Sequence, residues 1–472
     1  MVVSTRRAVV RRCAAGEGQR VEHFDVLVLG SGCGLEIVEQ AVAREKSVAL
    51  IEPGPLGGTC LNAGCIPSKM LIAPADSVAE MERTARLGIR THVESVDFPG
   101  IMRRMRADRA HMRSHLRESI GSGVRHFRKP GVFVAPHVVR SGTTEIEAPQ
   151  VFIAAGARTV IPPIPGLDSV DYLTNESVLE LSEKPGSLII MGGGYIAVEY
   201  CHFFASMGTK VTVVEMMDRL VTSEEPEVSA ALQQSLSKRA HILTGMKVEA
   251  VSTGRRIVSV RARPTDGGES RTYRAERLLV AVGRRSNADL LGVAEAGIET
   301  DRRGFITVDA HMRTNQPEVY AVGDINGRAM FRHAANVQAL VAAANAFDGA
   351  DVEMDYRAVP HAVYSHPQIA SVGLTEAQAR EAGHDVVTTI TPYADVAKGQ
   401  ALMEFEGFTK AVVERGSERI LGFHIIGPYA PILIQEVVNA MQSGGHMDEL
   451  VRGIHIHPEL TELIPSSLAL PQ

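Results

Sequence analysis

A glycine-rich segment close to the N-terminus constrains the fold of this chain more than any other feature. Residues 30–35 read Gly-Ser-Gly-Cys-Gly-Leu, follow an apolar run at 24–29, and precede a helical pattern that ends near residue 44. A second apolar run, residues 48–51, leads to Glu52. This strand–helix–strand pattern, with an acid about twenty residues after the glycines, is the fingerprint of a dinucleotide site. The glycines permit a tight turn beside a pyrophosphate, and the start of the helix stabilises that anion.

The same pattern recurs in the middle of the chain. Three glycines at 192–194 follow the apolar run 188–191, and a helical pattern with Ala197 at the small third position leads to a strand at 211–214 and then to Glu215. Two such units predict an α/β fold with two Rossmann-like domains and two bound nucleotides. Because Glu215 can accept hydrogen bonds from a ribose but repels a 2′-phosphate, the second unit is predicted to prefer NAD(H) over NADP(H).

A pair of cysteines follows the first glycine segment. Residues 57–69 read Gly-Gly-Thr-Cys-Leu-Asn-Ala-Gly-Cys-Ile-Pro-Ser-Lys, which places Cys60 and Cys65 five positions apart and just before a predicted helix. A disulfide over so short a ring is strained and reducible, and a helix start together with Lys69 stabilises thiolates. A structural or incidental pair is the alternative. The two nucleotide units favour a relay of electrons between a dithiol, a flavin and a nicotinamide.

Composition and charge limit the classes of protein to which the chain can belong. It has 472 residues, enough for two to four domains, and its net charge of −6 gives no reason to expect nucleic acid or an anionic membrane as a partner. No apolar run approaches the length of a membrane span. Five scattered cysteines do not suggest a secreted disulfide framework, so a cytoplasmic location is expected. No metal is expected.

Two basic segments leave more than one interpretation open. Residues 1–22 carry four arginines before any acidic residue, and we predict a flexible basic tail, with a transit peptide or a misassigned start codon as alternatives. Residues 98–121 form a predicted helix with six arginines and several methionines. One solvated face and one packed face is the simpler interpretation of this helix. A surface that guides an anionic substrate is the other.

The remaining segments predict further elements of the α/β fold and a third domain. A helix is expected over residues 77–87 and a β-meander over 131–155. Residues 314–324 predict a strand that feeds a tight turn and presents the carboxylate of Asp324. After residue 351 the pattern changes to an antiparallel sheet flanked by helices, which predicts a separate C-terminal domain.

A second chemical constellation lies near the C-terminus. His457 precedes Pro458, which is expected to start a helix, and Glu462 lies a little more than one turn further along. A carboxylate at that place can hold the imidazole in one tautomer and raise its basicity. A surface histidine beside an incidental glutamate is the alternative. In a chain that already carries a redox dithiol, an acid–base pair is favoured.

Together these motifs resemble the pyridine nucleotide–disulfide oxidoreductases, specifically the two-cysteine flavoprotein reductases, over residues 23–467. The resemblance implies a homodimer whose active site is shared across the interface. It also implies two Rossmann-like domains, one binding FAD (23–156 and 282–350) and one binding NAD (157–281), followed by an α+β C-terminal dimerisation domain (351–472).

The resemblance assigns roles to the cysteines and to a charged pair. It implies that Cys60 exchanges with the substrate, and that Cys65 contacts the flavin and forms a charge-transfer complex with it. Lys69 and Glu199 resemble an ion pair beside the flavin N5.

Further roles are implied for the second half of the chain. Tyr195 resembles a gate over the nicotinamide, Asp324 resembles a ligand of the flavin ribityl chain, and His333 lies where backbone atoms approach the flavin ring. His457, held by Glu462, resembles the acid–base that serves the cysteines of the partner subunit. The residues implied to bind FAD are Gly30, Gly32, Gly34, Glu52, Gly58, Thr59, Lys69, Ala155, Gly156, Asp324 and His333. Those implied to bind NAD are Gly192, Gly194, Tyr195, Ile196, Glu215 and Gly283.

Small features separate the members of this family. Glu215 fits the NAD-linked dihydrolipoyl dehydrogenases, and the presence of both cysteines argues against a soluble transhydrogenase. Residues 465–472 contain no cysteine pair, which argues against mercuric reductases and large thioredoxin reductases. Other features resemble the mycothione reductases, which prefer NADPH: Leu35 in place of the third glycine, and residues 65–70, 367–370 and 393–397.

We therefore expect an FAD-dependent enzyme that moves electrons between NAD(H) and a small dithiol–disulfide couple. A dihydrolipoyl group, free or carried on a protein, is the first candidate substrate, which makes the chain dihydrolipoyl dehydrogenase-like. A reductase of another low-molecular-weight disulfide, mycothione-like or glutamylcystine-like, is the second. A non-catalytic FAD scaffold or electron-transfer subunit is a third, and the intact Cys60–Cys65 and His457–Glu462 pairs argue against it.

Overall fold

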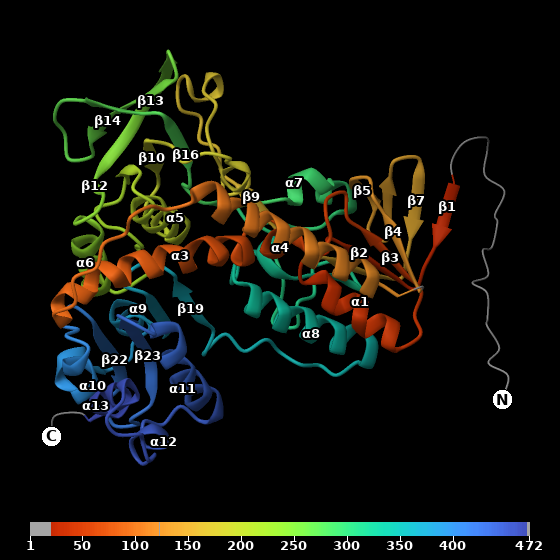
Figure 1. Cartoon of the computed structure of the whole chain (residues 1–472). Helices are drawn as coiled ribbons and strands as arrows, with labels where there is room; N and C mark the ends of the chain where they lie inside the picture. Colours follow the sequence, from red (N-terminus) through yellow and green to blue (C-terminus); the bar gives the residue numbers. More distant parts are fainter. Residues whose placement is uncertain (1–19, 122, 470–472) are drawn as a thin grey trace. The chain divides into compact units, whose positions relative to one another are not determined.

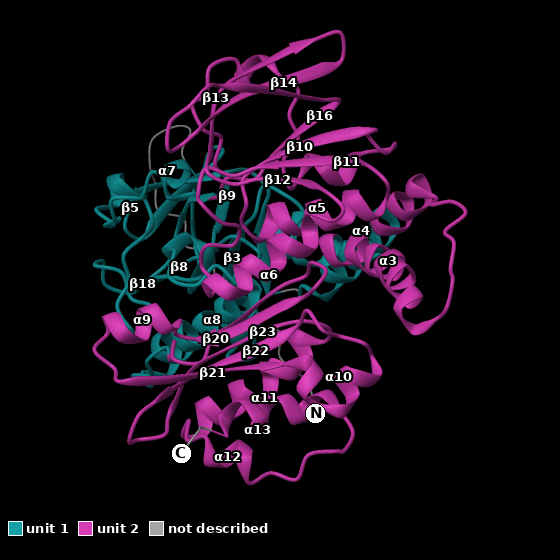
Figure 2. Ribbon diagram, turned by 90° about the vertical axis from the view of Figure 1, so that its left-hand side faces the viewer, with its two compact units in different colours: residues 1–67, 106–159, 284–354 teal, residues 68–105, 160–283, 355–472 magenta. Residues whose placement is uncertain are grey.

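The computed structural model describes residues 20–121 and 123–469, which fall into two compact units (Figures 1 and 2). Of the described residues, unit 1 comprises 20–67, 106–159 and 284–354, and unit 2 comprises 68–105, 160–283 and 355–469. The described part of the chain contains no helix that is both long and apolar enough to cross a bilayer.

The predicted basic tail needs one correction. Most of residues 1–22 lie outside the described residues, but Arg20–His23 form strand β1. This strand pairs in parallel with β7 (Thr144–Glu147), and Glu22 is buried there, beside Arg125. The end of the predicted tail is therefore part of a sheet.

Unit 1 is built on a parallel sheet of five strands in the order β18-β8-β2-β3-β4. The strands are β2 (Val26–Leu29), β3 (Val48–Ile51), β4 (Val124–Phe127), β8 (Gln150–Ile153) and β18 (Val319–Ala321). All residues of β2 and β3 are buried, as expected of strands covered on both faces. Helix α1 (Gly34–Ala43) packs on this sheet and on α8 (Arg332–Asp348). The first predicted strand–helix–strand unit is thus confirmed.

The β-meander predicted over residues 131–155 is correct for three of its strands. β5 (Gly131–Ala135), β6 (Val138–Ser141) and β7 pair in antiparallel fashion. β8 instead joins the parallel sheet between β18 and β2. Its residues 151–153 are all fully buried, which is typical of a central parallel strand and not of a meander with one solvated face.

Unit 2 contains the second predicted strand–helix–strand unit. Its parallel sheet has the order β12-β11-β10-β16. The strands are β10 (Ser187–Met191), β11 (Lys210–Val214), β12 (His241–Leu243) and β16 (Arg277–Val280). Helix α5 (Tyr195–Ser206) packs on β10 and β11. A three-stranded antiparallel sheet, β13 (Met246–Gly254), β14 (Ile257–Pro264) and β15 (Arg271–Ala275), packs against this part of the unit.

The C-terminal residues of unit 2 form the predicted antiparallel sheet. Its order is β19-β20-β23-β22-β21. The strands are β19 (Pro360–Val363), β20 (Ile369–Gly373), β21 (Val386–Pro392), β22 (Phe408–Glu414) and β23 (Ile420–Ile426). Helix α11 (Ala430–Ser443) packs on β19, β20 and β23, and helix α13 (Leu463–Leu468) packs on β21 and β22.

The helix predicted over residues 77–87 begins much earlier than expected. α3 runs from Cys65 to Arg83 and continues into a 3₁₀ turn, Thr84–Leu87. Proline interrupts helical hydrogen bonding in the interior of a helix. Pro67 lies in the first turn, where no N–H is needed, and Pro74 is accommodated inside the helix.

Residues 68–105 were predicted within the first domain but belong to unit 2. Side chains of α5 contact these residues. The ring centroids of Phe98 and Phe203 lie 5.9 Å apart, and His202 Nε2 lies 2.9 Å from Asp76 Oδ1. The two units do not separate the NAD-binding and C-terminal residues, so the three-domain division stays a prediction.

A buried cation joins the C-terminal sheet to helix α6 (Pro226–Leu236). Lys410 of β22 has a side chain only 2% exposed, and its Nζ lies 3.0 Å from a carboxylate oxygen of Glu225, of Glu227 and of Glu376. Removing one partner of a buried pair leaves the other charge uncompensated. Loss of Lys410 would therefore leave a buried carboxylate unpaired, and this penalty lowers the free energy of unfolding.

Replacing Lys410 by methionine is expected to lower the free energy of unfolding by about 3–5 kcal/mol, because Glu225 would stay buried without its cation. Lys238→Met is the matched control: its ion pair with Glu406 is 2.8 Å long but half exposed, and its loss should cost at most about 1 kcal/mol. Denaturant unfolding of both variants measures the difference. Equal losses of unfolding free energy in the two variants would show that burial does not determine how much an ion pair contributes to stability.

Candidate functional site

The first glycine segment forms the turn between β2 and α1. Gly30 has φ +101°, and a Cβ there would lie 2.4 Å from the carbonyl oxygen of Ala154, so only glycine fits. Buried Ser31 donates two hydrogen bonds to Glu52 Oε2, from its N–H (3.0 Å) and from its Oγ (2.8 Å). Glu52 Oε1 accepts a third from Gly54 N–H (2.9 Å). The carboxylate is therefore fixed at the end of β3.

The structure explains the leucine that departs from the glycine pattern. A Cβ on Gly34 would lie 2.8 Å from Val28 Cγ1 and 3.1 Å from Ala154 Cβ, so it is Gly34 that lets α1 approach the sheet closely. The third glycine of the fingerprint has this packing role. Leu35, one position later, is only half-buried. The third glycine of the motif thus lies one residue earlier than usual and keeps its role in close helix–sheet packing.

The cysteine segment is anchored to this turn. Cys60 is half-buried within the short helix α2 (Gly58–Ala63), and Cys65 is exposed at the first position of α3. Gly57 N–H donates to Ser31 Oγ (3.0 Å), and a Cβ on Gly58 would lie 2.6 Å from Gly32 Cα. The close backbone approach of the two segments therefore depends on glycine. Thr59, also named as a cofactor contact, is exposed on α2.

Two other described cysteines differ sharply from this pair. Cys33 and Cys201 are buried, and burial raises the pKa of each thiol to about 12. Their thiolates are therefore scarce near neutral pH, and a thiolate is the reactive form. Cys60 and Cys65 are the accessible thiols among the described residues.

The turn after β18 presents Asp324 beside the first glycine segment. A Cβ on Gly323 would lie 3.0 Å from Cys33 Sγ, so the two turns are packed together. Burial raises the pKa of Asp324, and Arg284, whose Nε lies 3.3 Å from Asp324 Oδ2, opposes that change. His333 lies in the first turn of α8 and stacks on Phe331 with ring centroids 5.7 Å apart.

The second glycine segment repeats the geometry of the first. Gly192 has φ +113°, and a Cβ there would lie 2.3 Å from the carbonyl oxygen of Ala281. Glu215 follows β11 as Glu52 follows β3, and its Oε1 accepts a hydrogen bond from Met217 N–H (2.6 Å). Tyr195, half exposed, and Ile196 begin α5.

Both segments leave room for a nucleotide. A Cβ added at Gly156 in unit 1, or at Gly194 and Gly283 in unit 2, would meet nothing within 4 Å. These positions border helix starts and strand ends, where a pyrophosphate can approach the backbone. Ala155, beside Gly156, accepts a hydrogen bond from Asn287 Nδ2 through its carbonyl (2.8 Å). The residues of each unit therefore fit the dinucleotide expected there.

Lys69 and Glu199 form a short ion pair within unit 2. Lys69 Nζ lies 2.9 Å from both carboxylate oxygens of Glu199, which is buried on α5. Glu199 Oε1 also accepts a hydrogen bond from Tyr364 N–H (3.1 Å), and Lys69 Nζ lies 4.5 Å from the centre of the Tyr364 ring. The predicted contact between these two residues is present.

His457 and Glu462 also meet, although the helix starts later than expected. His457 Nδ1 lies 2.9 Å from Glu462 Oε1, and this hydrogen bond lowers the pKa of the Glu462 carboxyl. The prediction that Pro458 starts the helix is wrong: Glu459 caps a 3₁₀ turn, Leu460–Glu462, through a capping box with Glu462. Glu462 thus serves both the cap and the imidazole. His457 is 72% exposed.

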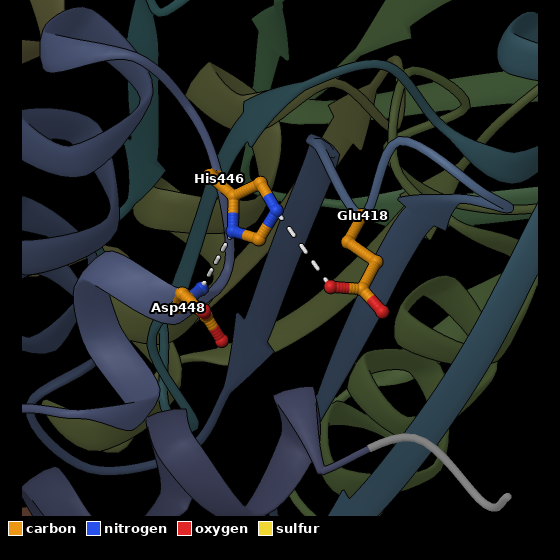
Figure 3. Close-up of side chains that lie close together, drawn as sticks. All are labelled: Glu418, His446 and Asp448. Atoms are coloured by element: carbon orange, nitrogen blue, oxygen red, sulfur yellow. Dashed lines mark hydrogen bonds and ion pairs between the residues drawn. The ribbon is translucent and has the colours of Figure 1, made fainter.

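A cluster of Glu418, His446 and Asp448 on unit 2 has the composition of a metal site (Figure 3). Its groups already have partners within the protein. His446 Nδ1 accepts a hydrogen bond from Asp448 N–H (3.2 Å), its Nε2 lies 3.6 Å from Glu418 Oε2, and Asp448 pairs with Arg452. We assign no metal to this surface cluster.

Two contributors were not among the predicted site residues, Ser31 and Asn62. Ser31 lies inside the recognised glycine segment, and its role follows from contacts that spacing does not show. Gly34 was predicted as a cofactor contact, but its packing against Val28 was not. Asn62, midway between the cysteines, receives hydrogen bonds from two arginines of the predicted basic helix. Its place between Cys60 and Cys65 was the only signal in the sequence.

Comparison with known proteins finds both halves of this chain in one protein family. The family model described as pyridine nucleotide-disulphide oxidoreductase matches residues 24–339, and the model of that family's dimerisation domain matches residues 359–467. A mycothione reductase of Mycobacterium tuberculosis is 36% identical over 462 residues, which cover 95% of this chain and 99% of the relative. A dihydrolipoyl dehydrogenase of Chlamydia muridarum is 33% identical over 457 residues, covering 95% and 97%.

Two further similar proteins are named for other activities. A mercuric reductase of Streptomyces lividans is 34% identical over 454 residues, covering 93% of this chain and 94% of the relative. The solved structure of a Cu(II) complex of the HOCl-induced flavoprotein disulfide reductase RclA from Escherichia coli matches with a TM-score of 0.85 at 27% identity, covering 96% of this chain and 100% of that chain.

Proposed function

This chain belongs to the pyridine nucleotide-disulphide oxidoreductase family, and from that membership we propose that it moves electrons between NAD(H) and a small dithiol–disulfide couple, with a dihydrolipoyl group as the favoured substrate. Enzymes of this family use FAD and a pyridine nucleotide. The observation that carries the proposal is the accessible Cys60–Cys65 pair, held against the first glycine turn through Ser31.

In the proposed mechanism the chain's own residues handle thiols and protons. His457 of the partner subunit takes a proton from the substrate dithiol. The resulting thiolate attacks Cys60, breaks the Cys60–Cys65 bond and releases Cys65 as a thiolate. The second substrate thiol displaces Cys60, so the substrate leaves as a disulfide and the enzyme holds two reduced cysteines. Bound FAD supplies the path by which the electron pair of this dithiol reaches NAD⁺ and regenerates the disulfide.

Several residues support that chemistry by binding and orientation. We propose that Glu52 and Glu215 accept hydrogen bonds from the two riboses. Lys69, paired with Glu199, offers a fixed positive charge, for which we propose a place beside the flavin. Glu462 holds His457 through Nδ1, which leaves Nε2 to exchange the proton.

The exposed position of His457 supports a dimeric active site. The C-terminal residues match the family's dimerisation domain, which indicates a homodimer. Ile454 and Ile456, next to the histidine, and Ile432 of α11 expose most or all of their side chains. Apolar side chains exposed together commonly mark a protein interface. We propose that a second copy covers them and receives His457 in its active site.

The nucleotide preference is carried by Glu215. Its carboxylate, oriented by Met217 N–H, would repel a 2′-phosphate. The kcat/KM with NADH should therefore be more than tenfold higher than with NADPH, a discrimination of more than about 1.4 kcal/mol. Glu215→Arg is expected to relax or reverse the preference. Asp218→Arg, which makes the same charge change three residues later, should leave it in place. Equal kcat/KM for both nucleotides in the unaltered enzyme would contradict this role.

A mycothione-type or glutamylcystine-type disulfide is the second candidate substrate. The relative named mycothione reductase and the similarity at Leu35 and residues 393–397 favour it, whereas Glu215 argues against the NADPH that such enzymes prefer. Steady-state kinetics with lipoamide, mycothione disulfide, glutathione disulfide and bis-γ-glutamylcystine distinguish the candidates. Absence of turnover with all four would favour the scaffold alternative.

A further inference from the structure

Two arginines of the basic helix reach the segment that carries the redox cysteines. Helix α4 runs from Phe98 to Ser119. Arg109 is only 7% exposed and Arg113 is half-buried, whereas Arg117 is exposed. Arg109 Nη1 donates to the carbonyl oxygen of Asn62 (3.1 Å), and Arg113 Nε donates to Asn62 Oδ1 (2.5 Å). Neither interpretation of this helix from the sequence included such a contact.

Asn62 connects these arginines to the loop around the cysteines. Its Nδ2 donates hydrogen bonds to three carbonyl oxygens, those of Pro55 (3.0 Å), Leu56 (3.0 Å) and Gly58 (2.8 Å). The side chain therefore closes the loop that leads into α2. Leu116 of α4 packs here too, because a Cβ on Gly57 would lie 3.1 Å from its Cδ2. The loop, α2 and the part of α4 from residue 106 onward form one packed assembly within unit 1.

Asn62, which both arginines contact, lies between the two cysteines in the sequence. Asn62 is two residues after Cys60 and three residues before Cys65. Cα atoms three residues apart are separated by at most about 11 Å. The Debye length at physiological salt is about 8 Å, and a partly buried charge is screened less than an exposed one. Two fixed cations at Asn62 are therefore expected to favour the thiolate forms of the reduced pair.

We propose that Arg109 and Arg113 are positioning residues for the Cys60–Cys65 pair, which act through Asn62 and favour its reduced form. This inference rests on the proposed function, because it assumes that the two cysteines cycle between disulfide and dithiol. Stabilising the thiolates raises the reduction potential of the pair. Holding Asn62 also fixes the segment from Cys60 to Cys65, whose two ends must bring the sulfur atoms together.

The test is a redox titration of the FAD-loaded full chain, in buffers of reduced and oxidised dithiothreitol. In this exchange the protein disulfide and reduced dithiothreitol yield the protein dithiol and cyclic oxidised dithiothreitol, so electrons and protons balance. Alkylation followed by mass measurement of the peptide that contains both cysteines gives the reduced fraction. Arg113→Gln should shift the equilibrium about tenfold toward the disulfide, about 30 mV for a two-electron couple.

Two variants separate charge from general damage. Arg117→Gln removes the same charge from the exposed part of α4 and should shift the equilibrium less than twofold. Arg113→Lys keeps the charge and should recover at least half of the equilibrium shift that Arg113→Gln produces. A purely structural role of the arginine would not give this recovery. If Arg113→Gln does not fold, Asn62→Asp replaces it, because it retains both arginines and adds a negative charge; the same direction of shift is expected.

The outcomes distinguish this inference from the function on which it rests. If the unaltered protein shows no change of mass between oxidising and reducing buffers, the cysteines are not a redox pair and the proposed function fails. If it titrates normally but Arg113→Gln coincides with Arg117→Gln, or Arg113→Lys shifts as far as Arg113→Gln, only the role of the arginines is overturned.

Discussion

Replacing Cys60 by serine is expected to lower turnover with every disulfide substrate by about a thousandfold or more. A serine hydroxyl neither forms a mixed disulfide nor accepts electrons from one, so the substrate loses its point of attack. Steady-state rates in both directions, with lipoamide and dihydrolipoamide, measure the loss. Cys201→Ala is the matched control, because that thiol is fully buried and its raised pKa keeps it protonated.

A second measurement shows whether the lesion is confined to thiol exchange. Reduction of bound FAD by NADH should continue in Cys60→Ser, since Glu215 and the second glycine segment are untouched. Cys65→Ser should in addition lose the long-wavelength absorbance that reduction produces in the unaltered enzyme. A Cys65→Ser enzyme that kept this absorbance would contradict the assignment of Cys65 as the residue beside the flavin. Substantial disulfide turnover by Cys60→Ser would remove the basis of the mechanism.

Local patterns explain why so much of the nucleotide-binding architecture could be predicted. Gly30 and Gly192 are required by a backbone conformation and a close carbonyl, and Glu52 and Glu215 follow their strands directly. Each feature depends on residues within about twenty-five positions, so spacing is enough to identify it. The antiparallel C-terminal sheet was predictable for the same reason.

What could not be predicted depends on contacts between distant segments. β8 looks like the end of a meander until its pairing with β2 and β18 is known. Asn62 and Arg113 are 51 positions apart, and nothing in either segment alone indicates that they meet. Leu35 looked like a defect in the motif because the packing of Gly34 against Val28 is visible only in three dimensions.

The second large effect is expected at His457. Its replacement by glutamine should lower turnover with any disulfide by about a hundredfold or more, the usual loss for a positioned general acid–base. FAD binding and flavin reduction by NADH should stay nearly intact, because those steps use other residues. Glu462→Gln should have a milder effect of the same kind, since Glu462 orients the imidazole and also caps the 3₁₀ turn.

The position of His457 allows a test that separates action in the partner's site from action within one chain. Its imidazole is 72% exposed, and fully exposed Ile454 precedes it by three residues, as expected if this surface meets another subunit. Inactive His457→Gln subunits are mixed with inactive Cys60→Ser subunits, and exchange is verified by mass. A heterodimer then places both defects in one site and leaves the other site whole, because a two-fold interface is reciprocal. Activity should reappear and reach at most about one site per heterodimer. If exchange occurs and no activity returns, His457 acts within its own chain or takes no part in turnover, and the shared active site must be abandoned while the role of Cys60 stands.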